Sequence, residues 1–249
     1  MIKVDGIRDF VMSREQPEGG FSFAKTTPAT LEDTYYALRI LKELGFSYDN
    51  KKTYRYIEQT ELDNLGYRQL FEALFLIREF WLTYDGDLVE KRLERKEKMS
   101  IDALYYKFQS LKLIMHENNI MKEEKDFISS KGIADLKYIS EVSRQVILLK
   151  RLGIQFNEKE YSLWIQGCQQ SDGGFGFNHK SSSYMENCYY ALIALHELKC
   201  LPKDIEACKS FILYCKSESG AFGRQILAVP TLEATFYGLE CLKILAEDR

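Results

Sequence analysis

Acidic residues and tyrosines recur together at a fixed spacing in three parts of the chain, and such pairs could carry out proton chemistry. Each acid lies three or four positions before an aromatic residue, so on a helix the two side chains would share one face. An acid placed in this way could donate or accept a proton, and the rings could shield a carbocation. We therefore expect catalytic roles for Asp33, Glu186, Glu233 and Tyr189, and substrate contacts from Tyr36, Tyr190 and Tyr237.

The same residues also have a structural interpretation, which stays open. An acid in the first turn of a helix complements the helix dipole, and tyrosine beside alanine and leucine packs one helix on another. For any single one of these residues the structural interpretation is the favoured one.

Basic residues stand in the loops just before the helices that carry these acids. They are Lys25, His179, Lys180 and Arg224. The first turn of a helix has unpaired N–H groups at the positive end of the helix dipole, and this arrangement favours anions. We predict that these cations contact an anionic substrate such as a diphosphate. The alternative is that they are ordinary solvated loop charges.

Cys188 follows Glu186 by two positions, near the expected start of a helix. A helix N-terminus lowers the pKa of a thiol, so Cys188 could contact a substrate or a metal. A lone cysteine in such a helix is more often a small apolar residue, and we favour that interpretation. All six cysteines fall in the last third of the chain without metal-type pairing, so we expect reduced and mostly buried thiols.

A repeated pattern indicates the elements that position these residues. A loop with a glycine and a phenylalanine precedes each acid, and the second small residue of the loop lies 12 positions before the glutamate at 32, 186 and 233. Weaker copies fill the middle of the chain. We expect six inner helices that begin near residues 32, 65, 102, 141, 186 and 233, each paired with an outer helix such as 158–169 or 202–215. Spacings of about 33 to 47 residues are typical of helix-pair repeats.

Composition favours one all-helical domain over residues 1–249. Hydrophobic residues make up 45% of the chain and charged residues 29%, which suits a large core and a solvated surface. The net charge is −3, so nucleic-acid binding is not expected. The sequence has no apolar run long enough for a membrane span and begins without a signal-peptide pattern, so we expect a cytoplasmic protein.

The loop Gln169-Gln170-Ser171-Asp172-Gly173-Gly174-Phe175-Gly176 resembles the repeat shared by protein prenyltransferase β-subunits and squalene-hopene-type terpene cyclases. The copy at Gln16-Pro17-Glu18-Gly19-Gly20-Phe21 is similar. The resemblance implies an all-α fold, the α6/α6 toroid, with a central cavity that takes an isoprenoid. It also implies a prenyl diphosphate substrate and the possibility of a helical partner chain.

The chain departs from the catalytic motifs of these families. The zinc-binding Asp-x-Cys pair resembles Glu186-Asn187-Cys188, but the family's histidine position holds Ala234, so we expect no zinc. The motifs Asp-x-Asp-Asp and Asp-Asp-x-x-Asp are absent from the sequence. Because acids stand near the predicted anion site, Mg²⁺ is a possible cofactor with a diphosphate.

The sequence therefore predicts an isoprenoid-acting enzyme of the prenyltransferase or terpene cyclase type. Two alternatives stay open: a non-catalytic lipid-binding or scaffold toroid, and the β-like subunit of a hetero-complex. Fold alone does not choose among the three.

Overall fold

The computed structural model describes residues 4–95, 97–116 and 119–247. These residues form two compact units, an N-terminal unit up to Met121 and a C-terminal unit from Lys122 onward. The N-terminal unit consists of α1 (Val4–Met12), α2 (Leu31–Glu43), α3 (Lys51–Glu58), the 3-10 helix η1 (Leu62–Asn64), α4 (Tyr67–Glu79), α5 (Gly86–Glu94) and α6 (Ile101–Leu113). The C-terminal unit consists of α7 (Lys122–Ser130), the 3-10 helix η3 (Ile133–Asp135), α8 (Ile139–Arg151), α9 (Glu158–Gly167), α10 (Met185–Glu197), α11 (Ile205–Tyr214) and α12 (Leu232–Glu247).

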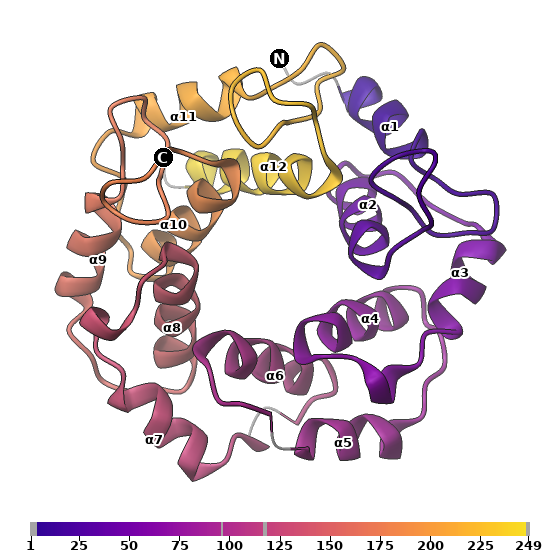
Figure 1. The fold of residues 1–249 in the computed structure, drawn as a ribbon, viewed down its shortest axis with the longest axis horizontal. Coiled ribbons are helices and arrows are strands. Elements are labelled where there is room, and N and C mark those ends of the chain that lie inside the picture. Colours follow the sequence, from indigo (N-terminus) through magenta and orange to yellow (C-terminus); the bar gives the residue numbers. More distant parts are fainter. Residues whose placement is uncertain (1–3, 96, 117–118, 248–249) are drawn as a thin grey trace. The chain divides into compact units, whose positions relative to one another are not determined.

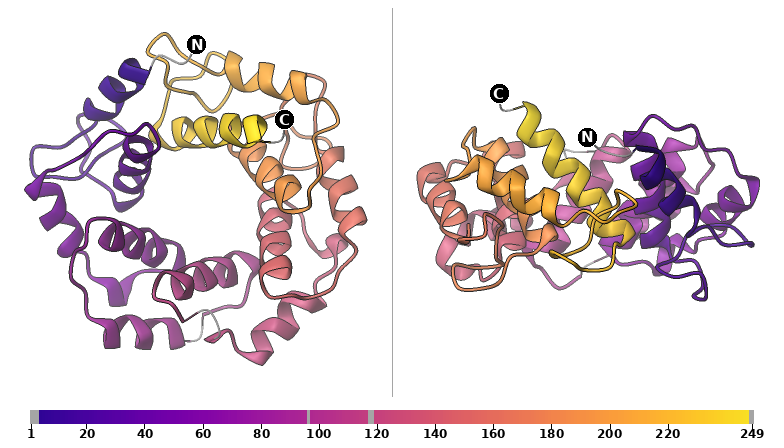
Figure 2. Two further views of the ribbon diagram at one scale, coloured as in Figure 1. Left: turned by 180° about the vertical axis from the view of Figure 1, so that it is seen from behind. Right: turned by 90° about the horizontal axis from the view of Figure 1, so that it is seen from above.

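The six predicted inner helices are α2, α4, α6, α8, α10 and α12. Each begins within two residues of its predicted start. Within each unit three inner helices lie side by side in one layer, and the outer helices run along that layer (Figures 1 and 2). In the N-terminal unit α4 packs between α2 and α6, and in the C-terminal unit α10 packs between α8 and α12. The described ranges contain no strand longer than an isolated bridge.

Capping side chains explain where two of the outer helices, α9 and α11, begin. α9 begins at Glu158, the predicted start, and Asn157 caps it, because the Asn157 side chain accepts the N–H of Glu160. The expected start at Pro202 is wrong: α11 begins at Ile205, and the Asp204 side chain accepts the N–H of Ala207. The carboxylate satisfies a free N–H group of the first turn and so sets the start of the helix.

The repeat register rests on one hydrogen bond that occurs three times. The phenylalanine of each glycine loop is fully buried, and its N–H group donates to the residue 13 positions later in the chain. The pairs are Phe21 with Thr34 Oγ1 at 2.9 Å, Phe175 with Cys188 Sγ at 3.3 Å, and Phe222 with Thr235 Oγ1 at 3.1 Å. Each loop is thereby fixed to the first turn of its inner helix.

The loop glycines permit close contact with the next outer helix. Gly173 has a φ of +88°, and a Cβ atom there would lie 2.2 Å from the carbonyl oxygen of Ala207 in α11. Gly19 has a φ of +105°, and its Cβ would lie 2.5 Å from the backbone of Lys52 in α3. A side chain at either position would force the loop away from the helix.

Five of the inner helices end in the same way. The residue after the C-cap has a positive φ, and the N–H group of the following residue donates to the carbonyl five positions earlier, for example Leu82 to Ile77 at 2.9 Å. This is the Schellman arrangement, which favours glycine at the positive-φ position. The residues at that position are Gly45, Trp81, Met115, Gly153 and Lys199.

None of the helices that the structure describes combines the length and the apolar composition that a membrane span requires.

Candidate functional site

The C-terminal unit holds a cluster of four aromatic rings on α10 and α12. The members of this aromatic cluster are Tyr189, Tyr190, Phe236 and Tyr237. Tyr189 and Tyr237 stack with their ring centroids 4.7 Å apart and an interplanar angle of 21°. Tyr190 lies 5.6 Å from Tyr189 and 6.0 Å from Tyr237. Phe236 and Tyr237 are buried, whereas Tyr189 and Tyr190 are half-buried, so the cluster keeps an accessible side.

Arg144 of α8 lies against this cluster. Its guanidinium carbon is 5.0 Å from the centroid of the Tyr190 ring, and its Nη2 donates to the Tyr190 hydroxyl at 2.9 Å. Only 7% of Arg144 is exposed, so its charge is held in surroundings that screen it poorly. The positive charge therefore sits at one edge of an aromatic surface.

A chain of polar contacts continues from Arg144 across the tyrosine hydroxyls. The hydroxyl oxygens of Tyr190 and Tyr237 are 3.5 Å apart, and Tyr237 donates to Glu233 Oε1 at 3.3 Å. The structure thus brings together three predicted site residues, Tyr190, Tyr237 and Glu233, with Tyr189 stacked beside them. Such a chain can move a proton between a hydroxyl and a carboxylate.

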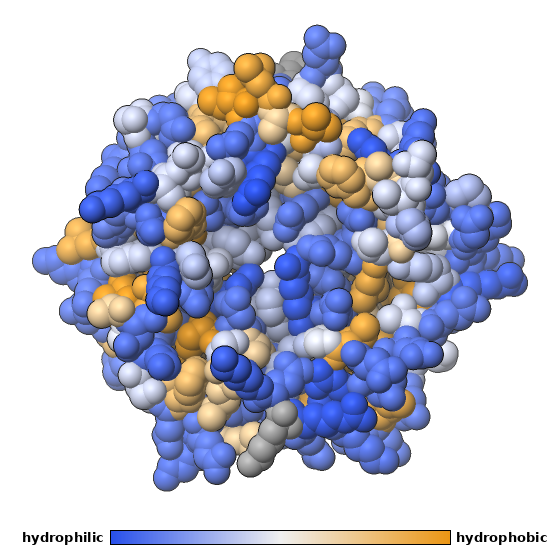
Figure 3. Space-filling model, in the orientation of Figure 1, coloured by the Kyte–Doolittle hydropathy of each residue, from blue (hydrophilic) through white to orange (hydrophobic). Residues whose placement is uncertain are grey.

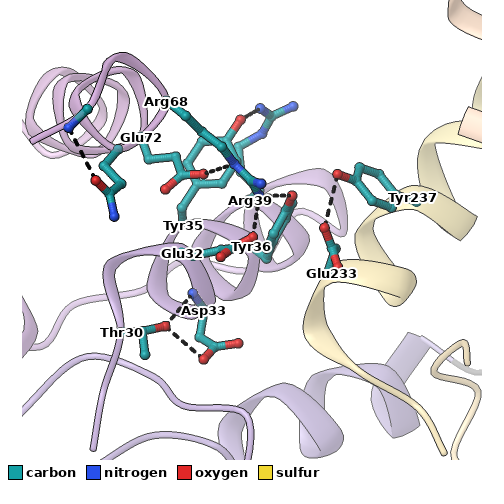
Figure 4. A network of polar contacts seen from close by, with 12 residues as sticks. Thr30, Glu32, Asp33, Tyr35, Tyr36, Arg39, Arg68, Glu72, Glu233 and Tyr237 are labelled. Atoms are coloured by element: carbon teal, nitrogen blue, oxygen red, sulfur yellow. Dashed lines mark hydrogen bonds and ion pairs between the residues drawn. The ribbon is translucent and has the colours of Figure 1, made fainter. Parts of the chain in front are cut away.

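The N-terminal unit repeats the combination of an arginine with a tyrosine of a neighbouring inner helix. Arg68 of α4 donates to the Tyr36 hydroxyl at 3.2 Å and to Glu72 at 3.0 Å, and it pairs with Glu32 (Figure 4). In both units an inner-helix arginine fixes the hydroxyl of the second tyrosine of a Tyr-Tyr pair. Arg39 fixes the first tyrosine of the N-terminal pair, Tyr35, through a hydrogen bond of 2.6 Å.

Asp33 lies apart from the Arg68 network (Figure 4). Thr30 Oγ1 donates to the Asp33 carboxylate at 2.8 Å and accepts the Asp33 N–H at 3.0 Å. Burial raises the pKa of Asp33, and the hydrogen bond from Thr30 opposes that rise. These contacts make Asp33 the N-terminal cap partner of α2, which is the structural interpretation of this acid.

The predicted cations do not all face one ligand. Arg224 Nη2 pairs with Glu186 Oε1 at 2.7 Å, and its guanidinium carbon lies 4.2 Å from the centroid of the Tyr184 ring. The hydrogen bond to Glu186 raises the pKa of Arg224. Lys25 is exposed in the loop before α2. The Arg224 charge is therefore balanced within the chain, and its role in holding a diphosphate stays a prediction.

Lys180 lies beside a polar hollow in the C-terminal unit. The hollow has a volume of about 560 Å³ and is lined by Lys180, by three serines at 181–183 and by Gln170, Ser171, Asp172, Phe211, Gln225 and Ile226. Beside it the loop before α12 exposes Ile226, Leu227 and Val229, and Figure 3 shows a hydrophobic patch at the top of this face, over the loop between α11 and α12.

His179 contacts the preceding outer helix, α9. Its Nε2 lies 3.0 Å from the Trp164 carbonyl oxygen, and its ring centroid is 5.2 Å from that of Trp164. The imidazole also packs over Gly167, where a Cβ atom would lie 2.9 Å from Nε2. The structure thus uses His179 to attach the loop to α9, and substrate contact by this residue stays a prediction.

The structure places Cys188 in the core. The residue is fully buried, and burial raises the pKa of its thiol well above the usual value. A protonated thiol is a poor nucleophile. The described residues also contain no group of three or more histidine, cysteine or acidic side chains that could hold a metal. Cys188 acts as the acceptor for the Phe175 N–H group, the position that threonine fills in two other repeats.

This assignment predicts the effect of substitution at Cys188. Cys188→Thr should cost less stability than Cys188→Val, because a threonine hydroxyl accepts the same hydrogen bond in the other repeats. Cys188→Val should cost about 1–3 kcal/mol, because it leaves the buried Phe175 N–H group without an acceptor. Denaturant unfolding of both variants measures the difference. Equal stabilities would contradict the assignment.

A family comparison decides the class of protein. A model of the prenyltransferase alpha-alpha toroid domain matches residues 2–74 and 76–249. The chain belongs to this family. The prediction of an all-α toroid built from helix pairs is thereby confirmed.

The chain is also similar to a solved prenyltransferase structure, Candida albicans protein geranylgeranyltransferase-I complexed with GGPP. The sequence identity is 14% and the TM-score is 0.45, and the match covers 99% of this toroid chain and 78% of the other. A comparison with curated proteins gives no match.

Arg144 and Arg68 are the residues that sequence reasoning missed. Arg144 stands between Ser143 and Gln145 in the predicted helix that begins near 141, so its sequence neighbours gave no signal that it would be buried. Neither arginine is part of the glycine-loop repeat, so the repeat pattern did not point to them.

Proposed function

We propose that this member of the toroid family binds a prenyl diphosphate and acts on it through the C-terminal unit. The observation that carries the proposal is the contact of Arg144 with the aromatic cluster of Tyr189, Tyr190, Phe236 and Tyr237. It combines an apolar aromatic surface with a fixed positive charge at its edge. A prenyl diphosphate has the complementary composition, with a long apolar chain and an anionic head.

The roles in the proposal follow from the chemistry of each group. The prenyl chain lies on the accessible faces of Tyr189 and Tyr190, where burial of apolar area stabilises it. Arg144 stabilises the negative charge of the diphosphate. If the diphosphate leaves, the ring faces stabilise the resulting allylic cation. When the cation loses a proton from a neighbouring carbon to form an alkene, Glu233 accepts that proton through Tyr237.

Because acids lie near this site, we expect a divalent cation to bind together with the diphosphate. Glu233 and Glu186 would repel a diphosphate in their ionised forms, and a bound Mg²⁺ would offset that repulsion. Binding should therefore be tighter with Mg²⁺ than without it. The residues that would hold the ion are Glu186 and Glu233, at the first turns of α10 and α12.

The ion pair between Arg224 and Glu186 favours a second candidate function, which is binding of an isoprenoid without turnover. A cation that is already paired with a carboxylate contributes less to a departing diphosphate than a free one. In this alternative the toroid holds a lipid, or serves as one subunit of a complex with a protein partner.

A product assay tests the proposal and separates the two candidates. The protein is incubated with radiolabelled geranylgeranyl diphosphate and Mg²⁺, and released diphosphate and prenyl products are measured over several turnovers. Release of diphosphate above the buffer rate supports the enzyme. Stoichiometric retention of intact ligand supports binding without turnover, and no retention at all contradicts both candidates.

Glu186→Gln should strengthen the binding of geranylgeranyl diphosphate in the absence of Mg²⁺ by about 3- to 10-fold, because it frees Arg224 and removes a repulsive charge. The matched control is Glu197→Gln, which removes another ion pair of α10, to Arg151 at 2.6 Å. Fluorescence titration compares the three proteins. If Glu186→Gln leaves the affinity unchanged, the result would favour the alternative that Arg224 is a loop charge without a role in diphosphate binding.

A further inference from the structure

Two large apolar side chains stand almost fully exposed at the ends of neighbouring inner helices in the N-terminal unit. Trp81 follows α4 and is 93% exposed, and Met115 follows α6 and is 82% exposed. Tyr84 lies three positions after Trp81 and is 43% exposed. Exposed apolar residues that gather in one place are a sign of an interaction surface.

Trp81 and Met115 also have a backbone conformation that is unfavourable for large side chains. Trp81 has a φ of +54° and Met115 a φ of +61°, in the left-handed region that favours glycine. Two other inner helices have Gly45 and Gly153 at the same position, and α10 has Lys199. A bulky residue in this conformation costs about 1 kcal/mol relative to glycine. Neither side chain offsets that cost by burial against the described residues of the N-terminal unit.

Both residues border a hollow between the ends of α4 and α6. Its volume is about 880 Å³, and its apolar lining consists of Leu74, Phe75, Ile77, Leu82, Tyr84, Leu113 and Ile114 together with Trp81 and Met115. The charged residues at the hollow have partners within the unit. Lys42 pairs with Glu79, and Arg78 donates to the Leu113 carbonyl at 3.2 Å. Glu79 thus balances the charge of Lys42, and the surface keeps the positive charge of Arg78.

We propose that this surface, defined by Trp81, Tyr84, Met115 and the hollow between α4 and α6, binds the same surface of a second copy of the chain. A two-fold interface uses one patch on both copies, so the patch must contain both a protruding group and a hollow that receives it. This patch contains both. Its content of Trp, Tyr, Met and Arg is that of an interface core.

The exposed side chains give an estimate of the area that the dimer interface buries. An aromatic side chain removes about 150–250 Å² from water when it is buried, so Trp81, Tyr84 and Met115 remove on the order of 400 Å² on each copy. The two copies together approach the lower limit of about 1,000 Å² for a specific interface. An interface of this size is typical of a weak or transient dimer.

Analytical ultracentrifugation of the full chain over about 1–300 µM tests this proposal. The variant is Trp81→Gly with Met115→Gly, which removes both side chains and places the residue that the backbone favours at each position. It should therefore fold at least as stably as the native chain, and its thermal midpoint is measured to check this. The control is Lys199→Gly, the same backbone position in the C-terminal unit. We expect native and control proteins to dimerise within this concentration range, and the double variant to stay monomeric.

Three results would overturn the proposal. The first is a native chain that stays monomeric over the whole range, and the second is a double variant that dimerises as strongly as the native chain. In the third, a monomeric native chain shows a blue shift of tryptophan emission on phosphatidylcholine vesicles that the double variant lacks. That result would assign the surface to a lipid bilayer instead.

Discussion

Gly173→Ala should lower the free energy of unfolding by about 3 kcal/mol or more, one of the largest effects expected of a single methyl group in this chain. Two costs add. A left-handed backbone at φ +88° costs alanine about 1–2 kcal/mol. The new Cβ would also lie 2.2 Å from the Ala207 carbonyl oxygen, and relieving such an overlap costs about 1–3 kcal/mol. Denaturant unfolding at constant pH measures the sum.

Gly153→Ala is the matched control for this experiment. Gly153 has a φ of +67°, and a Cβ atom added there would have no heavy atom within 4 Å beyond its chain neighbours, so the variant has the backbone cost without the overlap. It should lose only the backbone cost of about 1–2 kcal/mol. If the two variants were equally stable, the contact between the glycine loop and α11 would not be what holds the repeat together.

Arg144→Gln should weaken the binding of geranylgeranyl diphosphate by about 10- to 100-fold. The substitution removes the charge beside the aromatic cluster and the hydrogen bond to the Tyr190 hydroxyl. A charged hydrogen bond contributes about 1.5–3 kcal/mol, which corresponds to that range. Tyr190→Phe keeps the ring and removes only the hydroxyl, so it should have a smaller effect. Isothermal titration calorimetry with Mg²⁺ present measures both variants.

Arg151→Gln separates this effect from a general loss of charge on α8. Arg151 lies on the same helix, and its ion pair with Glu197 is half-exposed, so its loss should change binding less than about 2-fold. The unfolding free energy of each variant is measured in parallel. A binding loss in Arg144→Gln that only matches its loss of stability, or an equal loss in Arg151→Gln, would contradict the role of Arg144.

The inner helices could be predicted from sequence because local chemistry fixes them. The buried loop phenylalanine and its acceptor 13 positions later, such as Phe21 with Thr34, must recur in every complete repeat. The diverged copies that start α4 and α8 lack this loop, and there the predicted starts at 65 and 141 differ from the structure by two residues. The third repeat without this loop, that of α6, begins one residue from its predicted start, as the complete repeats do.

The site could be predicted only in part, because its contacts join residues far apart in the chain. The Tyr190–Arg144 bond spans 46 positions and the Arg224–Glu186 bond spans 38. A local pattern finds Tyr190 and Glu186 as members of a repeat but does not give their partners. Sequence therefore predicted Arg224 as a cation for the substrate, and the structure shows it paired with Glu186.

Calorimetric titration of geranylgeranyl diphosphate into the native chain, with Mg²⁺ and at several temperatures, tests the proposed function most directly. A prenyl chain on the aromatic cluster predicts saturable binding of one ligand per chain, with a negative heat-capacity change because apolar surface is buried. Binding should weaken when Mg²⁺ is removed. The absence of saturable binding at ligand concentrations of about 100 µM, with equilibrium dialysis in agreement, would contradict the proposal that this toroid takes an isoprenoid diphosphate.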